Sequence, residues 1–239
     1  MTHSRIKILI IKNDPVVEIS EKQIKFFRKS LIDWFKNNGR DFPWRRSGVT
    51  EYESIIVELL LQRTKAVTVA KVYSGFISKF PSWDALDNAD DLELEKYLKP
   101  IGLWKRRKVS IKELTQEMVK LGGNFPSSYD EIIELPGIGQ YIGNAIMIFT
   151  KQKNYPLLDS NMARILERFF HKRKLADIRD DPFLQGISFS VVQKVDPKII
   201  NWAIIDVAST ICKIKKPQCQ QCPIREQCSF YNNLARLIN

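Results

Sequence analysis

The stretch Leu135–Gly143, with the sequence LPGIGQYIG, separates two helical patterns and predicts a tight turn between two helices. Its last glycine falls one place too late for a dinucleotide-binding fingerprint, and the segment before the turn is helical rather than a strand. Glycines that expose successive backbone N–H groups at a helix N-terminus form a nest for an anion such as a phosphate. An ordinary helix–helix turn is the alternative interpretation.

Amphipathic helical patterns dominate the chain on both sides of this turn and predict an all-α fold. The clearest run from about Glu51 to Lys65, from Asp159 or Ser160 to Phe170, and from about Lys198 to Ile211. Only Lys7 to Ile11 suggests a short strand or an ordered tail. The sequence has no internal repeat and no low-complexity segment.

Composition predicts a folded, basic protein. A chain of 239 residues that is 44% hydrophobic can bury a sizeable core, either as one domain or as two lobes. Its 38 Lys and Arg residues against 27 Asp and Glu residues give a net charge of +11, which favours a polyanionic partner, above all nucleic acid. A basic protein without such a partner is the alternative.

The apolar run Ile8–Ile11 is too short for an export signal or a membrane span, so we expect a cytoplasmic protein that does not bind membranes. In that reducing compartment, metal ligation is a better expectation for cysteines than disulfide bonds.

The four cysteines lie close together near the C-terminus, as Cys212-x6-Cys219-x2-Cys222-x5-Cys228. Four thiolates suit either an iron–sulfur cluster or a tetrahedral zinc ion. Zinc sites usually combine two close pairs, whereas only one pair here is that close. Four basic residues lie between the cysteines, and they either hold a phosphate backbone or face solvent: Lys213, Lys215, Lys216 and Arg225.

Three motifs in order carry a family resemblance: the 135–143 turn, Asp159 eighteen residues after Tyr141, and the four cysteines. Together they resemble the helix-hairpin-helix DNA glycosylases of the endonuclease III and MutY superfamily, over about residues 21 to 230. Arg40–Arg45 and Glu58–Thr64 look like the MutY and archaeal thymine-mismatch branches. Tyr141 points to the thymine-mismatch branch, whose members remove thymine or uracil opposite guanine.

The resemblance implies a two-lobed architecture with DNA in the cleft between the lobes. A six-helix barrel of residues 44–153 would carry the hairpin. Residues 21–43 and 154–239 would form a discontinuous domain around a [4Fe-4S] cluster held by the four cysteines, and residues 1–20 would be an N-terminal extension. We expect a monomer that acts on double-stranded DNA containing a mismatched or damaged base.

Three residues are the candidate catalytic groups. By the family's spacing, Asp159 would stabilise the oxocarbenium-like transition state, although it is also placed to cap a helix. Glu58 would face the base pocket and protonate the leaving base or order a water, unless the polar stripe that it shares with Glu51 and Gln62 faces solvent. Tyr141 would stack on the extruded base, or merely pack the hairpin.

The remaining candidates would bind DNA. By the resemblance, Arg63, next to Gln62, would bond the orphaned base while Leu103 plugs the gap, against the alternatives of a solvated charge and a core leucine. The run Lys105–Lys108 is either a phosphate clamp or a solvated helix start, and phosphate contact is favoured. The expected DNA-binding residues are Gln62, Arg63, Leu103, Lys105, Arg106, Leu135, Gly137, Gly139, Gln140 and Gly143.

The resulting hypothesis is a monofunctional base-excision repair glycosylase for thymine or uracil opposite guanine. Alternatives within the class are an adenine-specific mismatch glycosylase and a bifunctional, endonuclease III-like glycosylase and lyase. The absence of an extra domain after about residue 230 weakens the first. Outside the class, the chain could be a non-catalytic iron–sulfur DNA-binding protein or a ferredoxin-like carrier, interpretations that Asp159 and the basic charge respectively disfavour.

Overall fold

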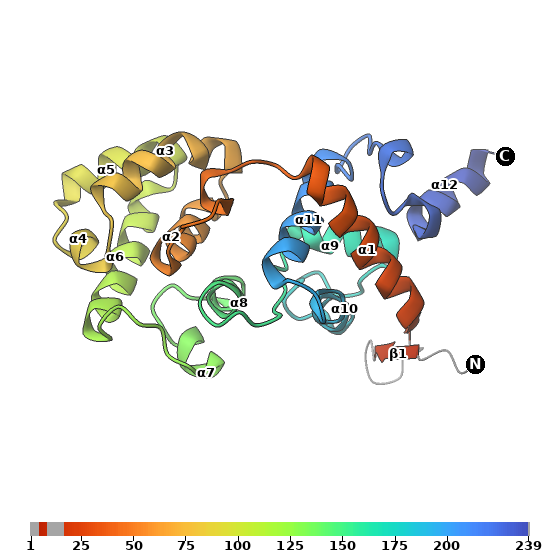
Figure 1. Cartoon of the computed structure of the whole chain (residues 1–239), viewed down its shortest axis with the longest axis horizontal. Coiled ribbons are helices and arrows are strands. Elements are labelled where there is room, and N and C mark those ends of the chain that lie inside the picture. The colour runs from red at the N-terminus through yellow and green to blue at the C-terminus, as the bar shows by residue number, and fades with distance from the viewer. Residues whose placement is uncertain (1–4, 9–16, 239) are drawn as a thin grey trace. The chain divides into compact units, whose positions relative to one another are not determined.

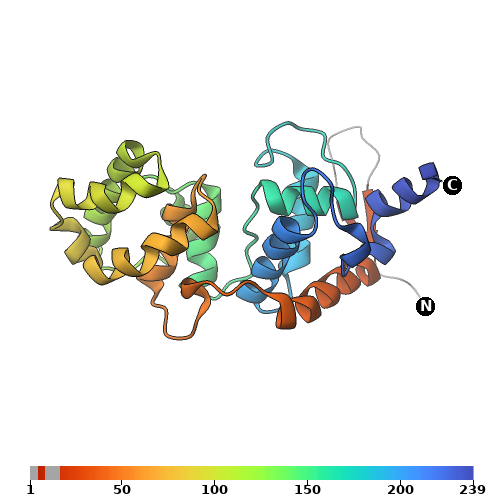
Figure 2. The ribbon, with the colours of Figure 1, turned by 90° about the horizontal axis from the view of Figure 1, so that it is seen from above.

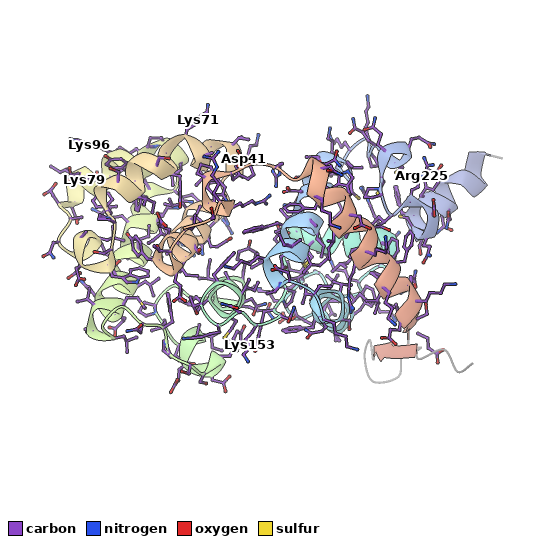
Figure 3. The ribbon with its side chains drawn as sticks, in the orientation of Figure 1. Asp41, Lys71, Lys79, Lys96, Lys153 and Arg225 are labelled. Carbon is purple, nitrogen blue, oxygen red and sulfur yellow. The ribbon has the colours of Figure 1, made fainter. Side chains whose placement is uncertain are left out.

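A computed structural model of the protein describes residues 5–8 and 17–238. Contacts divide the chain into two compact units, one of Met1–Arg40 with Asn154–Asn239 and the other of Asp41–Lys153. Figure 3 labels Asp41 and Lys153, the first and last residues of the second unit. Among the described residues, no helix is both long enough and apolar enough to cross a membrane.

The first unit begins with a small antiparallel sheet of β1 (Arg5–Ile8) and β2 (Val17–Ser20), paired so that Arg5 faces Ser20. Its helices are α1 (Glu21–Asn38), α9 (Ser160–Phe169), α10 (Pro182–Val192), α11 (Pro197–Thr210) and α12 (Ser229–Ile238). Helix α1 packs on α10 and α11 (Figure 1). The core includes Phe27, whose ring lies 5.0 Å from that of Phe169.

The second unit is built from helices alone among its described elements (Figure 2). They are η1 (Pro43–Arg45), α2 (Glu51–Leu61), α3 (Ala66–Lys79), α4 (Trp83–Asp87), α5 (Asp91–Leu98), η2 (Lys99–Ile101), α6 (Trp104–Lys120), α7 (Tyr129–Ile133) and α8 (Gln140–Phe149). Helix α2 is the central element, because it contacts α3, α6 and α8 and all but three of its residues are buried. Its start is fixed by a capping box, in which Thr50 and Glu53 exchange hydrogen bonds.

The helical fold predicted from the sequence is confirmed for the described residues, and the N-terminal strand expected around Lys7–Ile11 is present as far as Ile8, with residues 9–11 outside the described part. The helix predicted over Glu51–Lys65 is too long. Helix α2 ends at Leu61 because the chain turns at Arg63, which has a left-handed φ of 55°, and Ala66 begins the next helix.

Candidate functional site

The hairpin of the second unit is formed by α7, the turn at 134–139 and α8. Gly137 has a φ of +72°, a conformation that favours glycine, and Gly139 is the N-cap of α8 but has no side chain to cap it. Both glycines are exposed, so the backbone here can approach an anion. Leu135 and Gln140, at the two ends of the turn, are half-buried.

Gly143 has a different role from the one predicted. It is buried, and a Cβ added to it would lie 3.0 Å from Cγ2 of Ile133 and 3.4 Å from Cε2 of Tyr129. The glycine therefore allows α8 to pack closely on α7, and its prediction as a DNA contact is wrong. The adjacent Asn144 is also buried and accepts a hydrogen bond of 2.9 Å from Tyr129 Oη.

Tyr141 and Glu58 meet inside the second unit. Tyr141, in the first turn of α8, donates a hydrogen bond of 3.1 Å from Oη to Oε2 of Glu58 on α2. Glu58 is only 4% exposed, whereas Glu51 and Gln62 of its supposed stripe are exposed. The solvent-facing interpretation of Glu58 is therefore wrong, because packing against α8 buries this part of the helix.

Arg63 and Leu103 are the two residues that were expected to enter the gap left by an extruded base. They lie on turns at 62–64 and 101–103, which we call the insertion turns. Gln62 and Arg63 are exposed, and Leu103 is 54% exposed, so the core-leucine alternative for Leu103 is wrong. Thr64 Oγ1 donates a hydrogen bond of 3.1 Å to the carbonyl oxygen of Ile101 and so joins the turns.

The basic run at the start of α6 divides into two pairs. Lys105 and Arg106 are exposed, and the ammonium of Lys105 lies 5.4 Å from the ring centroid of Trp104. Arg107 is buried, and Lys108 forms ion pairs with Asp91 and Glu95. A phosphate clamp of four residues is therefore wrong, because the helix turns Arg107 inward and acidic neighbours neutralise Lys108.

Asp159 belongs to the first unit, where it is the N-cap of α9 as expected. Its Oδ1 accepts hydrogen bonds from the backbone N–H groups of Asn161 at 2.9 Å and Met162 at 2.8 Å. Its Oδ2 accepts a bond of 2.8 Å from the Asn161 side-chain amide. These hydrogen bonds hold the carboxylate in one orientation. Asp159 is half-buried, so its side chain is partly accessible to solvent.

The four cysteines are all free thiols and line one pocket of the first unit together with Arg168 and Arg225. Arg168 Nη1 lies 3.3 Å from Cys212 Sγ and 2.7 Å from the carbonyl oxygen of Lys213, so it braces the loop at this cysteine. Arg225 is held by the carbonyl oxygen of Gln220 at 2.6 Å and is labelled in Figure 3. Lys213, Lys215 and Lys216 are exposed.

The four thiols that line this pocket are the ligand set that an iron–sulfur cluster or a tetrahedral zinc ion would need. A tetrahedral zinc ion, with Zn–S bonds of about 2.3 Å, needs its thiolates close around one point. Among the described side chains, no three His, Cys, Asp or Glu residues are grouped to hold a single ion, although all four thiols face the same pocket. A cubane cluster needs four thiolates, one for each iron, and the four cysteines that line this pocket would supply them.

Helix α9 connects the cysteine loop to Asp159. Arg164 Nε donates a hydrogen bond of 2.8 Å to the carbonyl oxygen of Cys212, and its Nη2 donates one of 3.0 Å to Asn161 Oδ1. Asn161 in turn holds Asp159. Sequence reasoning missed Asn161, Arg164 and Arg168, although the two arginines are four residues apart and therefore lie on one face of the helix.

Comparisons with known proteins identify the family to which the chain belongs. Residues 56–178 match the model of the HhH-GPD superfamily base excision DNA repair protein. The thymine-DNA glycosylase of Aeropyrum pernix is 33% identical over 90% of this chain and 98% of its own length. The thymine/uracil-DNA glycosylase of Pyrobaculum aerophilum is 32% identical over 88% of this chain and 94% of its own.

A solved structure of a thermostable thymine-DNA glycosylase superposes with a TM-score of 0.81 and 29% identity, covering 89% of this chain and 98% of that one. The likeness thus extends well beyond the hairpin, through both units. This chain belongs to the HhH-GPD superfamily of base excision DNA repair proteins.

Proposed function

We propose that this protein is a monofunctional DNA glycosylase that hydrolyses the N-glycosidic bond of thymine or uracil opposite guanine in double-stranded DNA. The archaeal relatives named above support the substrate. The observation that carries the proposal is the Tyr141–Glu58 hydrogen bond, which combines an aromatic ring for the extruded base with a buried carboxyl group. A tyrosine in this place provides no amine for strand cleavage.

Asp159 is the proposed carboxylate of the reaction. When the bond between the base and C1′ breaks, its electron pair leaves with the base and positive charge develops on the deoxyribose. A carboxylate fixed by Asn161 stabilises that charge and deprotonates the water that adds to C1′. Because the same carboxylate also caps α9, the cap and the catalytic group are one side chain.

Glu58 is the proposed acid on the base side of the bond. In its protonated form it transfers a proton to the departing pyrimidine, whose negative charge is thereby neutralised. Tyr141 orients Glu58 through its hydroxyl and stacks on the base through its ring.

Four groups of residues are proposed to bind the duplex. The 135–140 turn binds a backbone phosphate, Lys105 and Arg106 bind further phosphates, Arg63 bonds the orphaned guanine, and Leu103 fills the space left by the extruded base. Exposure supports the assignment for Gly137 and Gly139 of the turn and for the side chains of Arg63, Leu103, Lys105 and Arg106, because each can reach a ligand without unfolding the unit.

The cysteines at 212, 219, 222 and 228 would hold a [4Fe-4S] cluster. Bound there, the cluster supplies ligand bonds that stabilise the C-terminal loop rather than a step of hydrolysis. The hydrogen bonds of Arg164 then give α9 a fixed attachment to that loop. We further propose a monomer that works in the cytoplasm on chromosomal DNA.

A panel of duplexes tests the proposal. Each duplex carries one pair (G·T, G·U, A·T, G·A or thymine glycol opposite adenine), and products are scored with and without hot alkali under single-turnover conditions. We expect abasic sites in the G·T and G·U duplexes only, with strand breaks only after alkali. Activity on G·A alone would identify an adenine glycosylase instead, and no activity on any duplex would favour the non-catalytic alternative.

A further inference from the structure

Arg107 is a buried cation that has no ion-pair partner among the described residues. It is 6% exposed, burial lowers the pKa of its guanidinium, and no carboxylate of the described residues lies within ion-pair distance. An unpaired buried charge is costly unless hydrogen bonds satisfy it. A buried arginine at this position therefore indicates a need for hydrogen-bond donors, which an apolar side chain would not provide.

The guanidinium satisfies its donors entirely on the two insertion turns and the end of α2. Its Nη2 donates to the carbonyl oxygen of Gln62 at 2.7 Å and to Thr64 Oγ1 at 3.0 Å. Its Nη1 donates to the carbonyl oxygen of Gly102, and to that of Ile101 at 3.4 Å. One planar group therefore binds both turns at once.

Both turns hold a non-glycine residue in the left-handed region, where φ is 55° at Arg63 and 50° at Leu103. Side chains rarely adopt this conformation because Cβ crowds the following carbonyl, and it persists only where the surroundings fix it. The bonds from Arg107 lie next to both strained residues, on Gln62, Thr64 and Gly102.

We propose that Arg107 is a positioning residue that holds the two insertion turns in register, so that Arg63 and Leu103 enter the duplex together. This inference rests on the proposed function, since it assigns how the base-extruding side chains are presented. A guanidinium suits the task better than an ammonium, because its five N–H donors lie in one rigid plane.

The test compares Arg107→Met and Arg107→Lys with Lys112→Met. Lys112 is the matched control: it lies on the same helix and its ammonium also binds carbonyl oxygens, those of Asp87 at 3.1 Å and Ala89 at 2.7 Å, away from the insertion turns. Amide hydrogen exchange of the full-length protein without DNA reports on the turns. Fluorescence of 2-aminopurine beside the thymine of a G·T duplex reports on extrusion.

We expect Arg107→Met to accelerate exchange in both turns, to abolish the fluorescence rise and to slow excision about 100-fold, as misplacement of a positioning contact does. Arg107→Lys should give a smaller change in each quantity, and it provides the test if the methionine variant does not fold. Lys112→Met should match the wild type in all three.

Unchanged exchange in the turns of both Arg107 variants, a change in one turn alone, or an equal effect of Lys112→Met would overturn the inference. Hydrogen exchange is measured without DNA. The experiment therefore distinguishes a failure of the coupling role of Arg107 from a failure of the proposed glycosylase function. Accelerated exchange in both turns, with a wild-type protein that neither extrudes nor excises thymine, would overturn the proposed function and the insertion role while confirming that Arg107 couples the turns.

Discussion

Tyr141 Oη donates its hydrogen bond to Glu58 Oε2 across 3.1 Å, and this contact joins the first turn of α8 to the buried side of α2. The hairpin residue and the carboxylate lie 83 positions apart in the chain, so only the packing of these two helices brings them together. The pair consequently places an aromatic ring and a potential proton donor at one site, next to a hairpin suited to hold DNA.

Glu58→Gln should slow single-turnover excision by about 100-fold, because the amide keeps a similar shape but cannot transfer the proton. Duplex affinity, measured by fluorescence anisotropy, should stay close to that of the wild type. Glu51→Gln is the control, since it removes an exposed carboxylate from the same helix. Equal rates for the two variants would remove Glu58 from the reaction.

Two substitutions of Asp159 separate its capping role from its chemistry. Asparagine is as good an N-cap as aspartate, so Asp159→Asn should keep the thermal stability and DNA affinity of the wild type while losing excision. Asp159→Ala should lose excision and also about 1 kcal/mol of folding stability. Wild-type single-turnover rates in the asparagine variant would leave Asp159 with the capping role alone.

The protein prepared without oxygen should be brown, with broad absorbance at roughly 400 nm and four irons per chain, as a cubane cluster requires. Cys219→Ser should lower the iron content, since it removes one of the four thiols that line the pocket. Elemental analysis decides the question. One zinc and no iron, or full iron in the serine variant, would contradict the assignment.

DNA binding should weaken steeply as salt rises, because Lys and Arg side chains displace counterions from the phosphate backbone. Lys105→Gln should reduce the slope of log K against log[salt] by about 1. Lys120→Gln should leave the slope unchanged, because this exposed lysine lies at the opposite end of α6, about 22 Å along the axis. Equal slopes for both variants would exclude Lys105 from phosphate contact.

Local sequence patterns correctly predicted the start of α9 and the turn before α8, because both depend on residues that are close together in the chain. Asp159 identifies the start of α9 because an N-cap bonds to backbone groups two and three residues ahead, and the structure shows those bonds. The 135–143 stretch predicted a helix–turn–helix for a similar reason, since glycine at 137 permits a positive φ.

Contacts between residues far apart in the sequence determine the end of α2 and the burial of Arg107 and Glu58. The sequence patterns did not reveal these features. Helix α2 ends at Leu61 rather than Lys65 at a turn held by bonds from Arg107, forty-five positions away from Gln62. Arg107 itself was concealed within a basic run, although it keeps helical spacing with the buried residues Ile111, Leu114 and Met118. Burial of Glu58 likewise follows from α8, which no pattern within α2 reveals.

The last prediction concerns strand cleavage, which the residue at position 141 should decide. A lysine amine at this position would be able to form a Schiff base with the sugar, after which β-elimination would break the strand. Tyr141 cannot form that imine, so borohydride should trap no covalent complex between the wild-type protein and a G·T duplex. Tyr141→Lys should yield a trapped complex on a duplex that already contains an abasic site, and it should excise thymine more slowly because the stacking ring is gone. Tyr141→Phe is the control: it keeps the ring, loses the bond to Glu58 and should trap nothing. Efficient trapping by the wild type would contradict the monofunctional assignment and would direct the search to another lysine.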